Sequence, residues 1–275
     1  MHKPLTQQNR FDAARPPAGM LELGVCYYPE QWPREKWDED ARRMVALGLA
    51  WVRIGEFSWS HIEPQAGVFH WEWLDEAIEV LGCAGLKVIL GTPTAAPPKW
   101  LVDRYPDILP VDERGVVRKF GARRHYCFSS RRYRLEAARI TEAMVRRYGE
   151  NPFVHAWQTD NEYGDHDTIH SYSDEAKLAF RQWLAARYGT AEAMNQAWGT
   201  TFWSMHYNTF DEVDLPNNLV EEPTPSHLVD YFRFSSDQVQ TFNKAQADII
   251  RQHSPGRPVT HNFMSQNTDF DHYKV

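Results

Sequence analysis

Apolar runs alternate with amphipathic segments along most of this chain. Short apolar runs predict strands, at residues 21–28, 49–54, 86–91, 153–157 and 258–263. Between these runs, apolar side chains recur at helical spacing, which predicts helices near residues 34–48, 74–83, 133–148, 174–188, 191–198 and 228–250. Strands that alternate with helices in this way indicate a parallel sheet.

The loops after the predicted strands are long, which favours a barrel over a doubly wound sheet. No Gly-x-Gly-x-x-Gly follows the first strand, and the sequence has no phosphate-binding Gly-Lys-Ser/Thr loop, so we expect no cofactor. A complete barrel needs eight strands, whereas the pattern supplies about five before Val275. We therefore predict an α/β fold, a (β/α)8 TIM barrel truncated after about five β/α units.

Composition and charge exclude several classes of protein. The 275 residues are 42% hydrophobic, which is enough for one large core. The net charge of −7 opposes binding to nucleic acid, and no apolar run reaches the roughly 20 residues that span a membrane. Residues 1–19 are polar and lack a signal-peptide core, so we expect a flexible tail, with residues 20–275 forming the barrel part. The widely spaced Cys26, Cys83 and Cys127 fit a reducing cytoplasm.

The candidate chemistry centres on a polar cluster at residues 160–163, directly after the fourth predicted strand. The carboxyl ends of parallel strands are where a barrel of this type holds its active site. Asn161 can hold a substrate hydroxyl there while Glu162 gives and takes a proton. An Asn-Glu pair alone is also an ordinary loop opening, so the assignment depends on the rest of the sequence.

Several sequence blocks resemble those of the family 42 glycoside hydrolases, the microbial β-galactosidases, and they occur in the family's order. The blocks are YYPEQWP at 27–33, RIGEFSW at 53–59, GTPTAAPPKW at 91–100, RRHYCFS at 123–129, QTDNEYG at 158–164, WGTTFW at 198–203 and HNFM at 261–264. The resemblance implies a (β/α)8 catalytic barrel followed by further domains, of which this chain is the first part. It also implies a homo-oligomer, which is a trimer in many relatives.

The resemblance implies retaining hydrolysis of terminal β-D-galactosides. Glu162 matches the general acid/base and proton donor, and Asn161 and Arg123 match substrate contacts. Arg53 ends the second strand, where related barrels place an arginine close to the catalytic carboxylates. Trp203 is expected to help wall the pocket. Retaining chemistry needs two carboxyl groups about 5–5.5 Å apart.

The second carboxyl group is the missing part of this mechanism. In the family the nucleophile is a glutamate after strand seven, which lies beyond Val275. Glu56 follows the second strand, but its block is shared by family members that do not use it for attack. We therefore expect the 275-residue chain alone to be inactive.

Many family members also hold zinc with four cysteines, and the resemblance extends to only one of these. Cys127 matches the first position, but the loop at 171–176 reads SYSDEA, and serine and alanine do not replace a thiolate on zinc. Asp165, His166 and His170 with Cys127 are an alternative ligand set, although this region is expected to be a loop. We expect no metal, and Cys127 packed as a small apolar side chain.

Two other interpretations stay open. A related retaining glycosidase acting on β-glucosides, β-xylosides or α-L-arabinosides would share Asn161 and Glu162, and the blocks at 27–33 and 123–127 disfavour it. A non-catalytic sugar-binding or partner-binding protein would leave an open barrel with an unpaired strand edge. His125, His155 and His261 could each face a pocket, although a satisfied core histidine is the better default.

Overall fold

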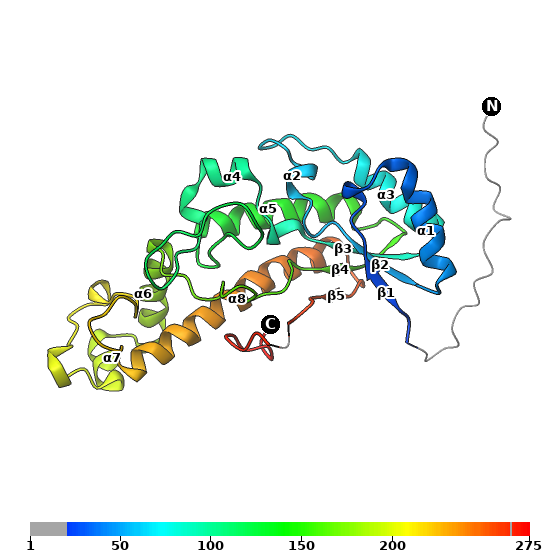
Figure 1. The fold of residues 1–275 in the computed structure, drawn as a ribbon. Helices are drawn as coiled ribbons and strands as arrows, with labels where there is room; N and C mark the ends of the chain where they lie inside the picture. The colour runs from blue at the N-terminus through cyan, green and yellow to red at the C-terminus, as the bar shows by residue number, and fades with distance from the viewer. Residues whose placement is uncertain (1–20, 265) are drawn as a thin grey trace, which may run out of the picture.

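A computed structural model describes residues 21–264 and 266–275, and one parallel sheet lies at its centre (Figure 1). The strands are β1 (Gly24–Cys26), β2 (Trp51–Ile54), β3 (Lys87–Gly91), β4 (Val154–Gln158) and β5 (Val259–Thr260). They pair in the order β1-β2-β3-β4-β5, every pair parallel. The sheet thus has the consecutive order of a barrel wall, because a doubly wound sheet reverses its order at a switch point. The predicted tail at residues 1–19 lies outside the described residues.

Helices connect the strands. They are α1 (Trp37–Ala46), α2 (Trp59–Ile62), α3 (Glu72–Cys83), α4 (Lys99–Arg104), α5 (Arg131–Tyr148), α6 (Asp174–Tyr188), α7 (Ala191–Trp198) and α8 (Pro225–His253). Short 3-10 turns occupy Pro29–Gln31, Arg34–Lys36, Pro93–Ala95, Pro106–Ile108, Phe202–Ser204 and Phe210–Glu212. The predicted truncated α/β barrel is confirmed. The longer helices agree with the predicted ones, whereas α2 and α4 were not predicted.

Side-chain caps explain where three of these helices begin. Ser130, Ser173 and Thr190 each accept a hydrogen bond from a backbone N–H in the first turn of α5, α6 and α7. Such caps satisfy a donor that the helix itself leaves unpaired. α7 ends at Trp198, and the next residue, Gly199, has a φ of 70°, the left-handed conformation that glycine adopts without a steric penalty.

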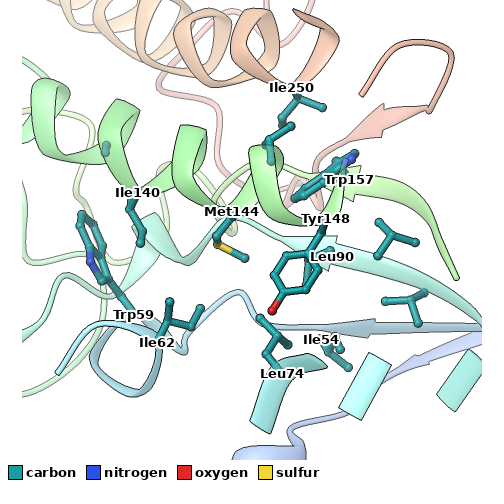
Figure 2. Close-up of a cluster of buried hydrophobic side chains, with 14 of the residues drawn as sticks. Ile54, Trp59, Ile62, Leu74, Leu90, Ile140, Met144, Tyr148, Trp157 and Ile250 are labelled. Carbon is teal, nitrogen blue, oxygen red and sulfur yellow. The ribbon is translucent and has the colours of Figure 1, made fainter. Parts of the chain in front are cut away.

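The main core lies between the sheet and the helices that cover it (Figure 2). Strands β2, β3 and β4 supply Ile54, Leu90 and Trp157, all fully buried. Helices α3, α5 and α8 supply the facing side chains, which include Leu74, Ile140, Met144, Tyr148 and Ile250. Burial of each large apolar side chain contributes about 1.5–3 kcal/mol, so this layer holds the strand ends of the candidate site in place.

A second apolar cluster joins α6, α7 and the first part of α8, away from the sheet (Figure 1). Phe180, Tyr231 and Phe234 form its aromatic centre. Cys127 is 1% exposed and packs in this cluster, which confirms the prediction that it behaves as a small apolar side chain. Among the described residues, no helix is both long enough and apolar enough to cross a membrane.

Candidate active site

The candidate site begins where β4 ends, at a backbone that turns away from the sheet in an unusual conformation. Asp160 and Glu162 have φ values of 47° and 46°. Left-handed backbone is uncommon for residues with a Cβ atom and persists where surrounding contacts impose it. The contacts around residues 159–163 therefore decide where the Glu162 side chain points.

A buried ion pair between Arg124 and Asp160 stabilises this turn. Asp160 and Arg124 both have fully buried side chains, with Arg124 Nη1 3.3 Å from Asp160 Oδ1. The carboxylate also accepts hydrogen bonds from Thr94 Oγ1 at 2.6 Å, Tyr126 OH at 3.0 Å and the Asn161 backbone N–H at 2.7 Å. Burial raises the pKa of the Asp160 carboxyl, and the Arg124 cation opposes that rise. A buried charge is tolerated when it is paired and hydrogen-bonded in this way.

Arg124 ties the same pair to the backbone of the loop. Its guanidinium donates to the Asn161 carbonyl oxygen, and its Nε donates to Thr168 Oγ1 at 3.1 Å. Neither Arg124 nor Asp160 was among the predicted site residues, although both lie in blocks that the resemblance used. Two adjacent arginines look alike in the sequence, and only the fold distinguishes the buried one.

The predicted acid/base and the predicted arginine contact lie together. Arg123 Nη1 is 2.6 Å from Glu162 Oε2, and Arg123 Nη2 donates to Asp165 Oδ2 at 2.8 Å. The side chains of Arg123 and Glu162 are 31% and 21% exposed, so both can reach a ligand. Asp165 was considered only as a metal ligand, and here it orients Arg123.

Arg53 reaches the end of β4 from the end of β2. Its Nε donates to Glu56 Oε1 at 2.9 Å, and its Nη1 donates to Gln158 Oε1 at 2.7 Å. Burial raises the pKa of the fully buried Glu56, and Arg53 opposes the rise. A Cβ atom on Gly91 would lie 2.6 Å from Glu56 Cβ, so β3 needs glycine at this position.

Direct contacts place these groups at one edge of the sheet, because Tyr28 after β1 stacks on Phe57 after β2 with ring centroids 5.9 Å apart, and Arg53 on β2 reaches Gln158 on β4. The Cys26 side chain on β1 is largely exposed, but partial loss of solvation raises the pKa of its thiol, and the charges of Arg53, Glu56 and Glu162 also act on it. Burial likewise raises the pKa of Tyr28 to about 12, next to Glu56. Side chains that follow β1, β2 and β4 thus converge at the carboxyl ends of the strands, as the barrel prediction required.

Residues after β5 hold the same loop from the other side. His261 Nδ1 donates to the Thr159 carbonyl at 2.7 Å, while its Nε2 accepts from the Tyr163 backbone N–H at 3.1 Å. The ring is therefore neutral, and burial lowers the pKa of His261 to about 3. The prediction of a satisfied histidine is confirmed for His261. It is wrong for His155, whose side chain is exposed because its position on β4 points away from the core.

The amide of Asn262 contacts two residues of the predicted site. Its Nδ2 donates to Asn161 Oδ1 at 2.8 Å, and its Oδ1 accepts from the Glu162 backbone N–H at 3.2 Å. Asn161 is 1% exposed, and its Nδ2 is buried with no hydrogen-bond partner in the described part of the chain. The sequence placed Asn262 in a family block, but no pattern in the sequence linked it to Asn161.

Trp203 does not lie among these residues. It belongs to the connection between α7 and α8, where the residue is 67% exposed and its ring stacks on Phe202 with centroids 4.6 Å apart. It lines a different cavity of about 610 Å³, together with Trp198, Tyr207 and His227. The expectation that it walls the pocket around Glu162 is not met by its position in this chain.

The residues around Cys127 do not fit a four-thiolate zinc site. Cys127 Sγ accepts a hydrogen bond from Ser173 Oγ at 3.5 Å, and Ser171 Oγ lies 3.3 Å from Ser173 Oγ. Within residues 21–264 and 266–275, no three His, Cys, Asp or Glu side chains form a group that could hold a metal ion. The alternative set with Asp165, His166 and His170 is therefore not assembled.

Comparisons with known proteins agree with this arrangement. The family model described as "Beta-galactosidase", for glycoside hydrolase family 42, matches residues 26–275. The "Beta-galactosidase" of Thermus thermophilus is 61% identical over 253 residues, which cover 92% of this chain and 39% of that protein. "Beta-galactosidase Bga" of Halorubrum lacusprofundi is 51% identical, covering 93% of this chain and 36% of its own length. The crystal structure of a β-galactosidase from the psychrophilic Marinomonas ef1 superposes with a TM-score of 0.91 at 59% identity, covering 92% of this chain and 39% of that one. This chain spans about 39% of the length of the first of these relatives, and it belongs to glycoside hydrolase family 42.

Proposed function

We propose that the complete protein containing this chain hydrolyses terminal non-reducing β-D-galactose residues in β-D-galactosides by a retaining double displacement. Membership of family 42 and the pairing of Glu162 with Arg123 at the end of β4 support the proposal. Glu162 first protonates the leaving-group oxygen, and then removes a proton from the water that hydrolyses the glycosyl-enzyme intermediate.

The other site residues bind the sugar and tune the charges around it. Asn161 offers the unpaired Nδ2 donor to a sugar hydroxyl, and Arg123 offers its guanidinium to a second one. Arg53, fixed by Glu56 and Gln158, supplies positive charge at the floor of the site. Positive charge close to a nucleophilic carboxylate favours its ionised form.

The nucleophile in this proposal is the glutamate that the family places after strand seven. The described residues form five strands, so we propose that residues 20–275 are the N-terminal part of the catalytic barrel and that further chain supplies the second carboxylate. The chain by itself is then expected to show no turnover of a chromogenic β-galactoside.

The test uses the complete gene product and 4-nitrophenyl glycosides of β-galactose, β-glucose, β-xylose and α-L-arabinose. We expect the highest kcat/KM for the β-galactoside, and β-galactose as the first anomer detected by proton NMR. Glu162→Gln should lower kcat on the order of 10²- to 10⁴-fold, the usual contribution of a general acid/base. A preference for another glycoside would favour a related glycosidase, and α-galactose as first product would exclude the retaining mechanism. Galactose binding without turnover would favour a sugar-binding protein.

We also propose that the complete protein is a homo-oligomer, and a trimer on the resemblance to its relatives. Phe202, Trp203 and Val220 are exposed large apolar side chains on the part of the chain around α7, and association would cover such a surface. Light scattering of the complete protein should give three times the chain mass, and a monomer would contradict the proposal.

We further propose a cytoplasmic location. Cys26, Cys83 and Cys127 are all free thiols, and Cys26 and Cys83 are exposed, which suits a reducing compartment. Cell fractionation should recover the protein with cytoplasmic markers, and recovery from the medium would contradict this.

A further inference from the structure

The side chain of Asn262, just after β5, contacts both residues of the predicted Asn161–Glu162 pair. It joins the Asn161 side chain to the Glu162 backbone through two hydrogen bonds of 2.8 and 3.2 Å. This inference rests on the proposed function, because it concerns how Asn161 meets a sugar.

The direction of these bonds follows from elementary chemistry. A backbone N–H only donates, so the Glu162 N–H requires the carbonyl oxygen of the Asn262 amide. The NH₂ group of Asn262 must then face Asn161, and a donor there requires the Asn161 carbonyl oxygen. Asn161 is left with its own NH₂ group as the free end of the chain of bonds. That nitrogen is buried and has no hydrogen-bond partner among residues 21–264 and 266–275.

We propose that Asn262 is a positioning residue that fixes the amide of Asn161 so that a hydrogen-bond donor, and not an acceptor, faces the sugar. The ligand atom that accepts the hydrogen bond from Asn161 is a hydroxyl oxygen next to the reacting carbon of a glycoside, which is the oxygen of the sugar's 2-hydroxyl. Hydrogen bonds to that 2-hydroxyl strengthen in the transition state of glycoside hydrolysis. An unfixed amide would present the wrong group part of the time.

We call the two hydrogen bonds from the Glu162 N–H through Asn262 to Asn161 the relay. The contacts around it hold the Glu162 backbone in place. The Tyr163 N–H, next along the chain, is bound by the ring of His261, which also donates to the Thr159 carbonyl. On the other side of Glu162, the Asn161 backbone N–H donates to Asp160 Oδ1 at 2.7 Å. The N–H groups of both residues next to Glu162 are therefore hydrogen-bonded. A buried donor without a partner costs free energy. A ligand oxygen that accepts from the Asn161 NH₂ group would remove that cost.

The deciding variant is Asn262→Asp, tested in the complete protein. A carboxylate still accepts from the Glu162 N–H, but it offers only acceptors to Asn161. The side-chain amide of Asn161 should therefore flip by about 180°, so that its NH₂ group faces the new carboxylate and its oxygen faces the sugar. We expect kcat/KM for 4-nitrophenyl β-galactoside to fall on the order of 100-fold, and that for the 2-deoxy analogue to change little. Asn262→Ala leaves the Asn161 amide free to rotate, and its loss should be smaller than that of Asn262→Asp.

A matched control separates amide orientation from added charge. Asn243 on α8 accepts from Thr159 Oγ1 and Tyr163 OH beside the same loop, and its hydrogen bonds in the described part of the chain do not reach Asn161 or Glu162. Asn243→Asp introduces the same charge and keeps those bonds, so any effect should be equal for the two substrates. Equal losses on both substrates in Asn262→Asp would overturn the proposal, as would a selective loss in Asn243→Asp or an Asn262→Ala loss as large as that of Asn262→Asp.

A second measurement does not depend on turnover. A neutron structure of the complete protein locates the deuterons of both amides, and we expect the Asn161 ND₂ group to point away from Asn262. An ND₂ group that points toward Asn262 would refute the relay. Absence of activity in the wild-type protein would instead refute the proposed function and leave this test in force.

Discussion

The adjacent residues Arg123 and Arg124 provide a sharp test of the site's construction. We predict that Arg124→Met and Arg123→Met have opposite consequences for stability and activity. Arg124 is fully buried against Asp160 and also donates to Asn161 and Thr168. Arg123 is 31% exposed and pairs with acidic side chains at the mouth of the site.

The expected magnitudes follow from burial. Removing one partner of a buried ion pair leaves an uncompensated charge and costs about 3–5 kcal/mol. In Arg124→Met that charge is the Asp160 carboxylate, which would keep its hydrogen bonds from Thr94 and Tyr126 but lose its cation. A partly exposed pair contributes only about 0–1 kcal/mol, so Arg123→Met should unfold close to the wild-type midpoint.

The assay is urea unfolding of the complete protein, followed by tryptophan fluorescence, with kcat/KM measured on the same samples. The unfolding free energy of Arg124→Met should fall by about 3–5 kcal/mol, whereas Arg123→Met should remain stable and lose activity through its missing sugar contact. Equal stability losses in the two variants, or a loss below about 1 kcal/mol for Arg124→Met, would refute the conclusion that the buried Arg124–Asp160 ion pair supports the site.

Three further predictions concern pH, packing and metal. Burial lowers the pKa of His227 from 6.5 to about 4, so the unfolded chain binds the extra proton between these values. The contribution of His227 to the unfolding free energy should therefore fall by about 3 kcal/mol as the pH drops from 6.5 to 4, and His227→Gln should remove that contribution from the curve of unfolding free energy against pH. Gly91→Ala would bring a Cβ atom within 2.6 Å of Glu56 Cβ, and should destabilise the protein by about 1–3 kcal/mol in urea unfolding; an unchanged midpoint would contradict the close approach. Because Cys127 Sγ accepts from the Ser173 hydroxyl and all three cysteines are free, EDTA should leave the melting temperature unchanged, and a drop would reveal a bound metal.

Most of the fold could be predicted from the sequence because apolar spacing follows burial directly. The strand at Lys87–Gly91 and the helix at Arg131–Tyr148 are set by their own residues. α2 and α4 are only 4 and 6 residues long, and helices of that length depend on tertiary contacts that periodicity does not record. β5 is shorter than predicted because residues 261 and 262 turn to bind the loop after β4.

The candidate site was predictable only in part, for a related reason. Glu162, Asn161, Arg123 and Arg53 stand at strand ends or in family blocks, and the sequence indicates those places. Which arginine of a pair is buried, and which amide faces which, depends on backbone direction, such as the φ of 64° at Arg124. Trp203 was expected near Glu162 because of the block it belongs to, but that block lies at the far end of the α6–α8 excursion (Figure 1).

The role of Glu162 can be tested most directly by azide rescue of Glu162→Ala in the complete protein. Without its acid/base, a retaining glycosidase still forms the glycosyl-enzyme intermediate from an activated substrate such as 2,4-dinitrophenyl β-galactoside. Azide needs no general base and attacks from the face that water would use, so the account predicts faster turnover and β-galactosyl azide as the product. Formation of α-galactosyl azide would mean that Glu162 is the nucleophile, and full activity without azide would mean that it has no part in the chemistry.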